Sequence, residues 1–488
     1  MNAGLCEQFL PGLYFQFFFT LATERRTELP IKVKYPHKRT VRPHHSFLIH
    51  GNMTHHTKLP GKWVCFVLCL LLPLAAPAVL HASSFNACNP CDQAVFDPCG
   101  ALNNCGPKLG KWFINGHIEA GLFANGHGQK SLYRSDGDEG LGRGACDASG
   151  NTDFLMNTRL TGGSVNQIYI SMGKSVDGRR GLDFGGTVDF TWGSDAYLVQ
   201  ARGMEFGAGH GNPNPEGPEG RWGSGDYFAA FAQAYAEVAY DRWNIMAGKF
   251  YAPFGIDNYK STDNFFYSWS PTKSIAPTMG GGALAFYRAS DRLTLLGGWI
   301  MPEEVGESSK NNFVAGGFIW APGKNLNVRY VFATGENRYS GNIFAGNYDS
   351  YVHSLTTTYQ INKKWKNVLD WTYIQVRGDG PRNFTNEGHN LYSYALMNVL
   401  TYQHNSKWAF GTRFGVLNDN GFGTGRFSGK SEWYSVSLGA NWTPYKRLTI
   451  KPEVRYDWVE GSGEAFKPFK GKESTYQVSG GLSAVLKF

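Results

Sequence analysis

From residue 111 to the C-terminus, apolar and polar side chains alternate with a period of two in runs of about ten residues. In 447–460 (RLTIKPEVRYDWVE), every second residue from Leu448 to Trp458 is apolar, and the residues between them are polar or charged. Successive side chains of a β-strand point to opposite faces, so this pattern predicts strands with one oily and one polar face. Sixteen such runs follow one another between clusters of Gly, Asn, Asp and Ser, without a useful helical period. The chain is therefore predicted to be all-β.

The connections between these runs alternate in length. Short ones, such as 240–243 and 404–407, recur between longer Gly-rich stretches such as 195–226 and 252–280. Tight turns at one end and long loops at the other, with an even strand number, are typical of outer-membrane barrels. Residues 111–488 are predicted to form an antiparallel transmembrane β-barrel of about sixteen strands. The loop 195–226 is a candidate for folding inward as a constriction.

The position of the aromatic rings decides which face is inside. Trp408 and Phe410 share a face with Phe414, whereas Arg413 and the small residues around it share the other. A soluble sandwich would bury its apolar face, but rings near strand ends are expected of the aromatic girdles of a membrane barrel. The charged face is therefore predicted to line a water-filled lumen. Pro452 cannot donate to a ladder, so a bulge is expected there.

The lumen-facing charges are candidates for setting ion selectivity. Six acids against five bases predict weak selectivity. In an alternative role, these charges pair across the lumen and stiffen the wall. The candidates are Glu119, Asp183, Asp189, Glu237, Glu453 and Asp457 with Arg329, Arg413, Lys451, Arg455 and Lys487.

The N-terminus is predicted to direct export. Residues 53–78 combine a basic start, the apolar stretch WVCFVLCLLLPLAAPAVL and a small-residue cleavage site, as a signal peptide does. A membrane anchor is the alternative, but prolines interrupt the apolar run and it is short of the ~20 residues that a spanning helix needs. A normal signal begins at Met53, so residues 1–52 are interpreted as a non-native upstream extension. The mature chain is expected in the bacterial outer membrane.

Four cysteines crowd into the predicted periplasmic segment 79–110. Cys88, Cys91, Cys99 and Cys105 are candidates for two disulfides, because exported proteins fold in an oxidising compartment. A zinc site is the alternative, although the spacings lack the paired short gaps of zinc ribbons. Haem attachment is excluded because Asp92 follows Cys91.

Neither nucleic-acid binding nor catalysis is indicated. The net charge of +8 is concentrated in 1–78, and beyond it 38 basic residues face 36 acidic ones, without a basic run. The glycines at 106–112 and 421–426 lack the context of a phosphate-binding loop. No catalytic, metal or cofactor site is predicted.

The last strand-like run, TYQVSGGLSAVLKF, ends on Phe488. This ending resembles the C-terminal aromatic signal of bacterial outer-membrane proteins, which the barrel-assembly machinery recognises. Five segments further resemble the OmpL-like β-barrel porin family, in particular its members from planctomycete-type bacteria: 113–128, 165–177, 183–205, 232–255 and 264–270. The resemblance implies a barrel in the outer membrane and passive transport, without a catalytic motif.

The sequence thus predicts a porin that contacts outer-membrane lipid and admits small hydrophilic solutes, with a homo-oligomer possible. One alternative is a lumen-blocked barrel that serves as a surface adhesin or scaffold. A second is a soluble or peripheral β protein.

Overall fold

The computed structural model describes residues 108–109, 111–125, 161–205, 222–224, 226–302, 305, 311–339, 346–378, 389–420, 430–461, 467, 469 and 474–488. The predicted upstream extension, the signal peptide and the cysteines of the segment 79–110 lie outside these residues. Among the described residues, no helix has the length and apolarity to cross a membrane.

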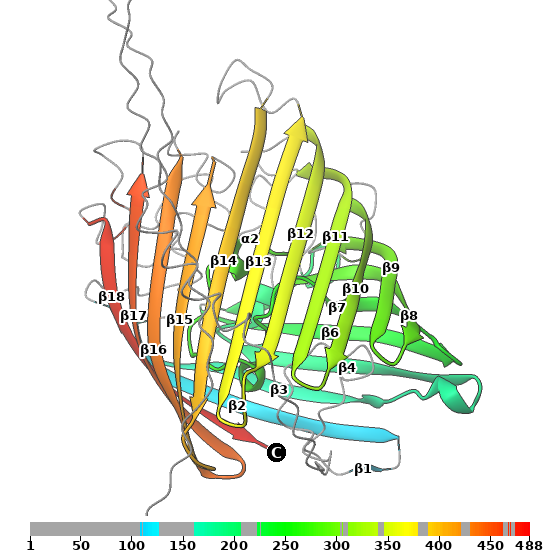
Figure 1. The fold of residues 1–488 in the computed structure, drawn as a ribbon, viewed down its shortest axis with the longest axis horizontal. Helices are drawn as coiled ribbons and strands as arrows, with labels where there is room; N and C mark the ends of the chain where they lie inside the picture. Colours follow the sequence, from blue (N-terminus) through cyan, green and yellow to red (C-terminus); the bar gives the residue numbers. More distant parts are fainter. Residues whose placement is uncertain are drawn as a thin grey trace, which may run out of the picture. The chain divides into compact units, whose positions relative to one another are not determined.

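Sixteen long strands form one closed antiparallel barrel (Figure 1). Each strand pairs with the next along the chain, and the last strand pairs with the first, with Leu482 opposite Leu122. Closure removes the free edges of the sheet, as a membrane-spanning sheet requires. The strands are β2 (Trp112–Asn125), β3 (Gly162–Lys174), β4 (Asp183–Gly193), β6 (Tyr227–Tyr240), β7 (Trp243–Tyr251), β8 (Met279–Ser290), β9 (Leu293–Pro302), β10 (Asn311–Gly323), β11 (Leu326–Tyr339), β12 (Gly346–Gln360), β13 (Trp365–Gly378), β14 (His389–Gln403), β15 (Trp408–Asp419), β16 (Ser431–Tyr445), β17 (Leu448–Gly461) and β18 (Tyr476–Lys487).

Shorter elements accompany the wall. The two-residue strands β1 (Lys108–Leu109) and β5 (Gly223–Ser224) pair with β2 and β6. In the described part of the chain, the 3-10 helices are η3 (Gly178–Arg180), η4 (Ala196–Val199) and η6 (Ser261–Asp263), and α2 (Thr272–Ile275) is a single-turn α-helix. Short connections such as 241–242, 291–292 and 446–447 all lie at one rim, which we call the short-turn rim. This rim corresponds to the periplasmic side of an outer-membrane barrel.

Outward-facing rings gather at the two rims of the wall. Trp408 and Trp442 stack at the short-turn rim with 5.6 Å between ring centroids, and Tyr434 and Trp458 stack toward the other rim at 5.0 Å. Rings in these positions suit the polar interfaces of a bilayer. The most exposed tryptophans at the short-turn rim are Trp112, Trp243, Trp320, Trp365 and Trp442.

The inner wall of β7–β11 differs from the predicted polarity. Trp299 and Val314 are 39% and 63% exposed on the outer face, so the residues beside them, Ile300 and Phe313, point inward. These inward side chains are apolar, and they form a buried cluster with Phe254 from the connection after β7. Further members are Met246, Phe250, Leu284, Phe286, Leu296, Val331 and Val352. The rule of one oily and one polar face therefore fails for this sector, where both faces are apolar.

The bulge expected at Pro452 is also absent. Pro452 stays in register with Leu482 on β18, and the extra residue on the β16 side lies nearer the turn, between Trp442 and Tyr445.

Candidate pore constriction

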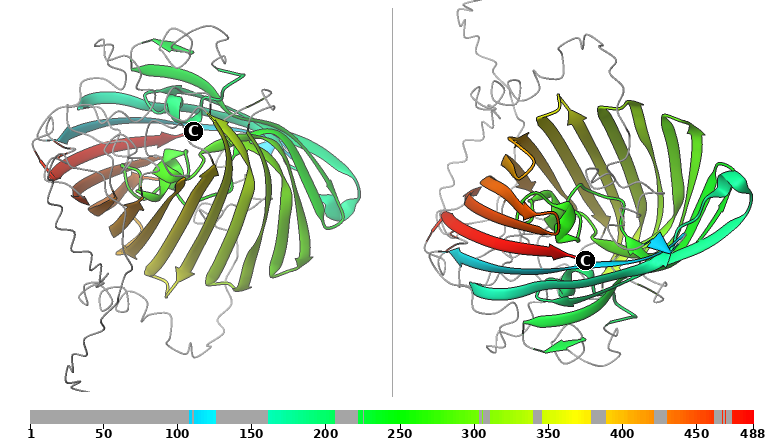
Figure 2. Two further views of the ribbon diagram at one scale, coloured as in Figure 1. Left: turned by 90° about the horizontal axis from the view of Figure 1, so that it is seen from above. Right: turned by 90° about the horizontal axis from the view of Figure 1, so that it is seen from below.

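The connection 252–278 between β7 and β8 folds into the lumen, and we call it the inward segment. In Figure 2 it is the green segment inside the ring of strands, and it carries η6 and α2. The amide of Ala252 donates to the carbonyl of Thr278 at 3.1 Å, which closes the base of the segment against the wall.

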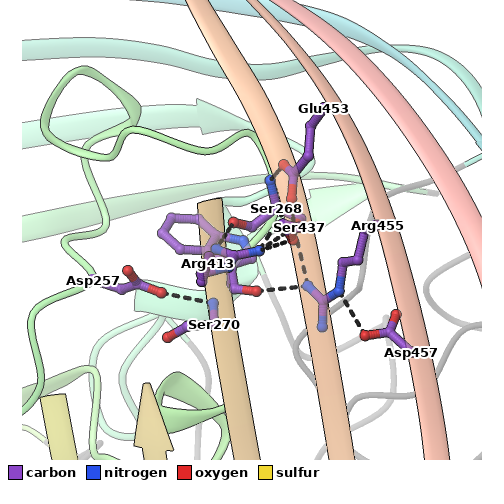
Figure 3. A network of polar contacts seen from close by, with 9 residues as sticks. Asp257, Ser268, Ser270, Arg413, Ser437, Glu453, Arg455 and Asp457 are labelled. Atoms are coloured by element: carbon purple, nitrogen blue, oxygen red, sulfur yellow. Dashed lines mark hydrogen bonds and ion pairs between the residues drawn. The ribbon is translucent and has the colours of Figure 1, made fainter. Parts of the chain in front are cut away.

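Ser268 is the centre of the contacts between the inward segment and β15–β17 (Figure 3). Its amide donates to Glu453 Oε2 at 2.8 Å and its hydroxyl to Glu453 Oε1 at 2.7 Å. Arg413 donates to the Ser268 carbonyl at 2.7 Å and to its hydroxyl at 2.6 Å. Arg455 donates to the same hydroxyl at 3.0 Å. One serine of the segment thus bonds to side chains from two strands, which fixes its depth in the barrel.

The charges around Ser268 compensate one another. Arg413 and Glu453 form an ion pair at 3.1 Å, and Arg455 and Asp457 form another at 2.8 Å. All four residues are at most 5% exposed. Buried charges are costly unless they are paired and hydrogen-bonded, so two arginines and two carboxylates form a neutral anchor. The guanidinium of Arg413 also lies 4.6 Å from the centroid of the Phe266 ring.

A second anchor joins both ends of the inward segment to β11 and β13. Asp370 accepts hydrogen bonds from the amide of Ile256 at 3.0 Å and from the hydroxyl of Thr272 at 2.8 Å. Arg329 donates to the carbonyl of Gly255. Gly255 has a φ of +66°, a left-handed conformation that favours glycine.

A third anchor holds the tip of the inward segment, residues 259–264, to β3 and β17. Gln167 donates to the Tyr259 carbonyl at 2.8 Å and accepts from the amide of Ser261 at 3.1 Å. Lys451 donates to the carbonyls of Ser261 at 2.5 Å and Asn264 at 2.6 Å. Beside this tip, the ammonium of Lys260 lies 3.5 Å from Asp189 Oδ2.

Glycines on the inner wall make room for the inward segment. A Cβ at Gly121 would lie 2.3 Å from the Tyr267 side chain, and a Cβ at Gly481 would lie 2.5 Å from the same side chain. A Cβ at Gly411 would lie 2.4 Å from a phenylalanine ring of the segment, and a Cβ at Gly415 would lie 2.8 Å from a proline of the segment. Contacts this short do not occur with real Cβ atoms, so the segment packs against the wall where side chains are missing.

The structure places the predicted lumen-facing charges on the inner face of the wall. Asp183, Glu237 and Lys487 are half-buried near the short-turn rim, where Lys174 pairs with Asp183 at 2.8 Å and Lys111 pairs with it as well. The other eight are at most 7% exposed: Glu119, Asp189, Arg329, Arg413, Lys451, Glu453, Arg455 and Asp457. Seven of these eight bond to the inward segment or to the ion pairs beside it, Asp189 through Lys260 of the segment.

The loop 195–226, which the sequence analysis offered as a candidate constriction, is described in part. Of it, the structure describes 195–205, 222–224 and 226. Val199 packs against Ala230 and Tyr259 at the edge of the inward segment. Glu205 pairs with Lys249 of β7 at 2.7 Å. Residues 206–221 and 225 of this loop lie outside the described residues, and among the described residues the connection that enters the lumen is 252–278.

An even number of antiparallel strands, short turns at one rim, aromatic rims and a connection folded into the lumen define the class: an outer-membrane β-barrel of the porin type. The sequence matches the family described as "Putative beta-barrel porin-2, OmpL-like" over residues 133–488, and the chain belongs to this family.

Solved porin structures share the fold. The outer membrane channel DcaP of Acinetobacter baumannii has a TM-score of 0.50 and 10% identity, covering 79% of this chain and 99% of that one. The anion-selective porin from Comamonas acidovorans has a TM-score of 0.49 and 10% identity, covering 77% and 99%. No curated protein matches the sequence. Family and fold locate the chain in the bacterial outer membrane and indicate a channel rather than an enzyme.

Proposed function

We propose that the protein is a passive diffusion channel for small hydrophilic solutes, with its constriction at the inward segment. The observation that carries this proposal is the fixed position of 252–278 inside the barrel, where Arg413, Asp370 and Lys451 bind it from three strands of the wall. A rigid segment within a lumen narrows the aqueous path, so size exclusion at this level selects the solutes.

Weak charge selectivity is the finer part of the proposal. The ion pairs Arg413–Glu453 and Arg455–Asp457 cancel within the wall and are buried. Buried, paired charges contribute little net field to the aqueous path. The selectivity is then set by the few charges that water reaches, and it is small.

The test is single-channel conductance of the full protein purified from outer membranes, measured in planar bilayers. We expect stepwise openings whose size scales with salt concentration. Entry of uncharged sugars of rising size into proteoliposomes then gives the exclusion limit. Silence from protein that is inserted and heat-modifiable on gels overturns the diffusion channel.

The second candidate function is a lumen-blocked barrel that presents its outer loops as an adhesin or scaffold. The breadth of contact between the inward segment and the wall favours it, since Gln167 on β3, Asp370 on β13 and Lys451 on β17 all bind the segment. The apolar cluster of β7–β12 fills a further sector. Such a barrel would insert and show heat-modifiable migration without conductance.

Assembly is proposed to depend on Phe488, on contact of the oily face with lipid and on the barrel-assembly machinery. Phe488 exchanges two backbone hydrogen bonds with Gly116, at 2.9 and 3.0 Å, and so completes the seam between β18 and β2. A homo-oligomer is a further proposal, tested by cross-linking in outer-membrane preparations.

A further inference from the structure

The tip of the inward segment lies toward the short-turn rim. Lys451, which holds Ser261 and Asn264, is the fourth residue of β17 counted from the short turn at 446–447. Ser268 binds further along the same strand, at Glu453 and Arg455. The segment therefore descends toward the short-turn rim and reaches its lowest point at 261–264.

Four charged residues belong to the inward segment, and three of them are engaged. Asp257 accepts from the amide of Ser270 at 2.7 Å, and its carbonyl accepts from Lys273 at 3.2 Å. Lys273 is 8% exposed. Lys260 is half-buried and pairs with Asp189. Lys260 is thus neutralised, Lys273 is covered, and Asp257 is half-buried and held by the Ser270 amide.

The fourth residue, Asp263, is exposed at the tip. Its carboxylate accepts from the hydroxyl of Thr262 at 2.9 Å and from the side-chain Nδ2 of Asn258 at 3.1 Å. Both donors are neutral, so they orient the carboxylate without cancelling its charge. Asp263 therefore presents a negative charge to the water below the constriction.

We infer that Asp263 is the residue that sets charge selectivity at the constriction, and that it favours small cationic solutes over anionic ones. This inference rests on the proposed diffusion channel. It extends that proposal because the weak selectivity is assigned to one carboxylate on the inward segment instead of to the charges of the wall. Lys487, near the short-turn rim, is the opposing charge that keeps the preference modest.

The experiment compares reversal potentials of the full protein under a potassium chloride gradient for wild type, Asp263→Asn and Asp263→Lys. Asn keeps the size of the side chain and one of the two acceptor oxygens. Asp291→Asn is the matched control, since it removes one exposed acid from the short turn between β8 and β9. Heat-modifiable migration shows that each variant is folded.

We expect wild type to prefer potassium, and Asp263→Asn to lower the potassium-to-chloride permeability ratio by about fivefold or more, because one charge about 4 Å from an ion in water attracts the cation and repels the anion. Asp263→Lys should reverse the preference, and Asp291→Asn should leave it unchanged. A conducting Asp263→Asn channel with the ratio of wild type, or a wild-type channel that prefers chloride, overturns the inference while the diffusion channel stands. A folded wild-type protein without conductance overturns both.

Discussion

Arg413 and Glu453 meet at 3.1 Å although a whole strand, β16, separates the strands that carry them. Their side chains reach across the inner face and enclose Ser268 of the inward segment. A connection that begins at residue 252 is thereby tied to strands some 150 to 200 residues further along the chain. The lumen of this barrel is organised by such long-range contacts.

Removing one partner of this pair should destabilise the barrel strongly. Glu453→Ala leaves the guanidinium of Arg413 buried without its counter-charge, and breaking a buried pair in this way costs about 3–5 kcal/mol of unfolding free energy. Urea unfolding in detergent micelles, followed by tryptophan fluorescence, measures the loss. Glu432→Ala, an exposed acid on the outer face of β16, is the control and should cost at most about 1 kcal/mol. Equal losses in the two variants would contradict an anchoring role for Glu453.

Neighbouring glycines on β18 should respond differently to the same substitution. A Cβ at Gly481 would lie 2.5 Å from the Tyr267 ring, whereas one at Gly480 has only a backbone oxygen at 3.8 Å. Gly481→Ala should therefore displace Tyr267 and destabilise the barrel by about 1–3 kcal/mol, and Gly480→Ala should be tolerated. The temperature at which the heat-modifiable form converts on gels compares them. If both variants convert at the wild-type temperature, Tyr267 does not pack on this wall.

The barrel itself could be predicted from local pattern. Alternation in runs such as 447–460 is set by the backbone of each strand alone, so the number of runs predicted the strand number, and the alternating connection lengths predicted the two rims. The predicted charges do lie on the inner face. Their partners could not be predicted, because Ser268 and Glu453 are 185 residues apart in the sequence. The alternation within a strand contains no information about contacts between segments so far apart.

Two departures show where local pattern was insufficient. The inner wall of β8–β10 is apolar because Phe286, Ile300 and Phe313 pack against one another and against Phe254, which removes the need for a polar inner face. The inward segment was missed because a long connection between strands is typical of an outer loop. The signal that could have identified it was the pairing of the aromatic run 264–270 with glycines at the wall positions 121, 411 and 481.

A disulfide should lock the inward segment to β15. A Cβ at position 415 lies 3.8 Å from the Cβ of Pro271, the separation usual for disulfides. We expect Gly415→Cys with Pro271→Cys to cross-link under mild oxidation, detected as a joined peptide by mass spectrometry. Because the segment is already in its inward position, the cross-link should leave conductance within about twofold of the reduced form. Conductance abolished by oxidation and restored by reductant would mean instead that the segment must move for solutes to pass.

Replacing the C-terminal residue should impair barrel assembly more than replacing an equally exposed phenylalanine elsewhere on the wall. Phe488 and Phe410 are both 45% exposed on the outer face, so their contact with lipid is comparable. Phe488 alone of the two lies on the seam between β18 and β2, where its ring covers Gly116; a Cβ there would lie 2.6 Å from that ring. Phe488→Ala should lower the yield of heat-modifiable barrel in the outer membrane by about tenfold, the factor that corresponds to about 1.4 kcal/mol. Phe410→Ala should leave the yield near wild type. Similar yields for both variants would mean that lipid contact, and not the position of the ring at the seam, accounts for the role of Phe488.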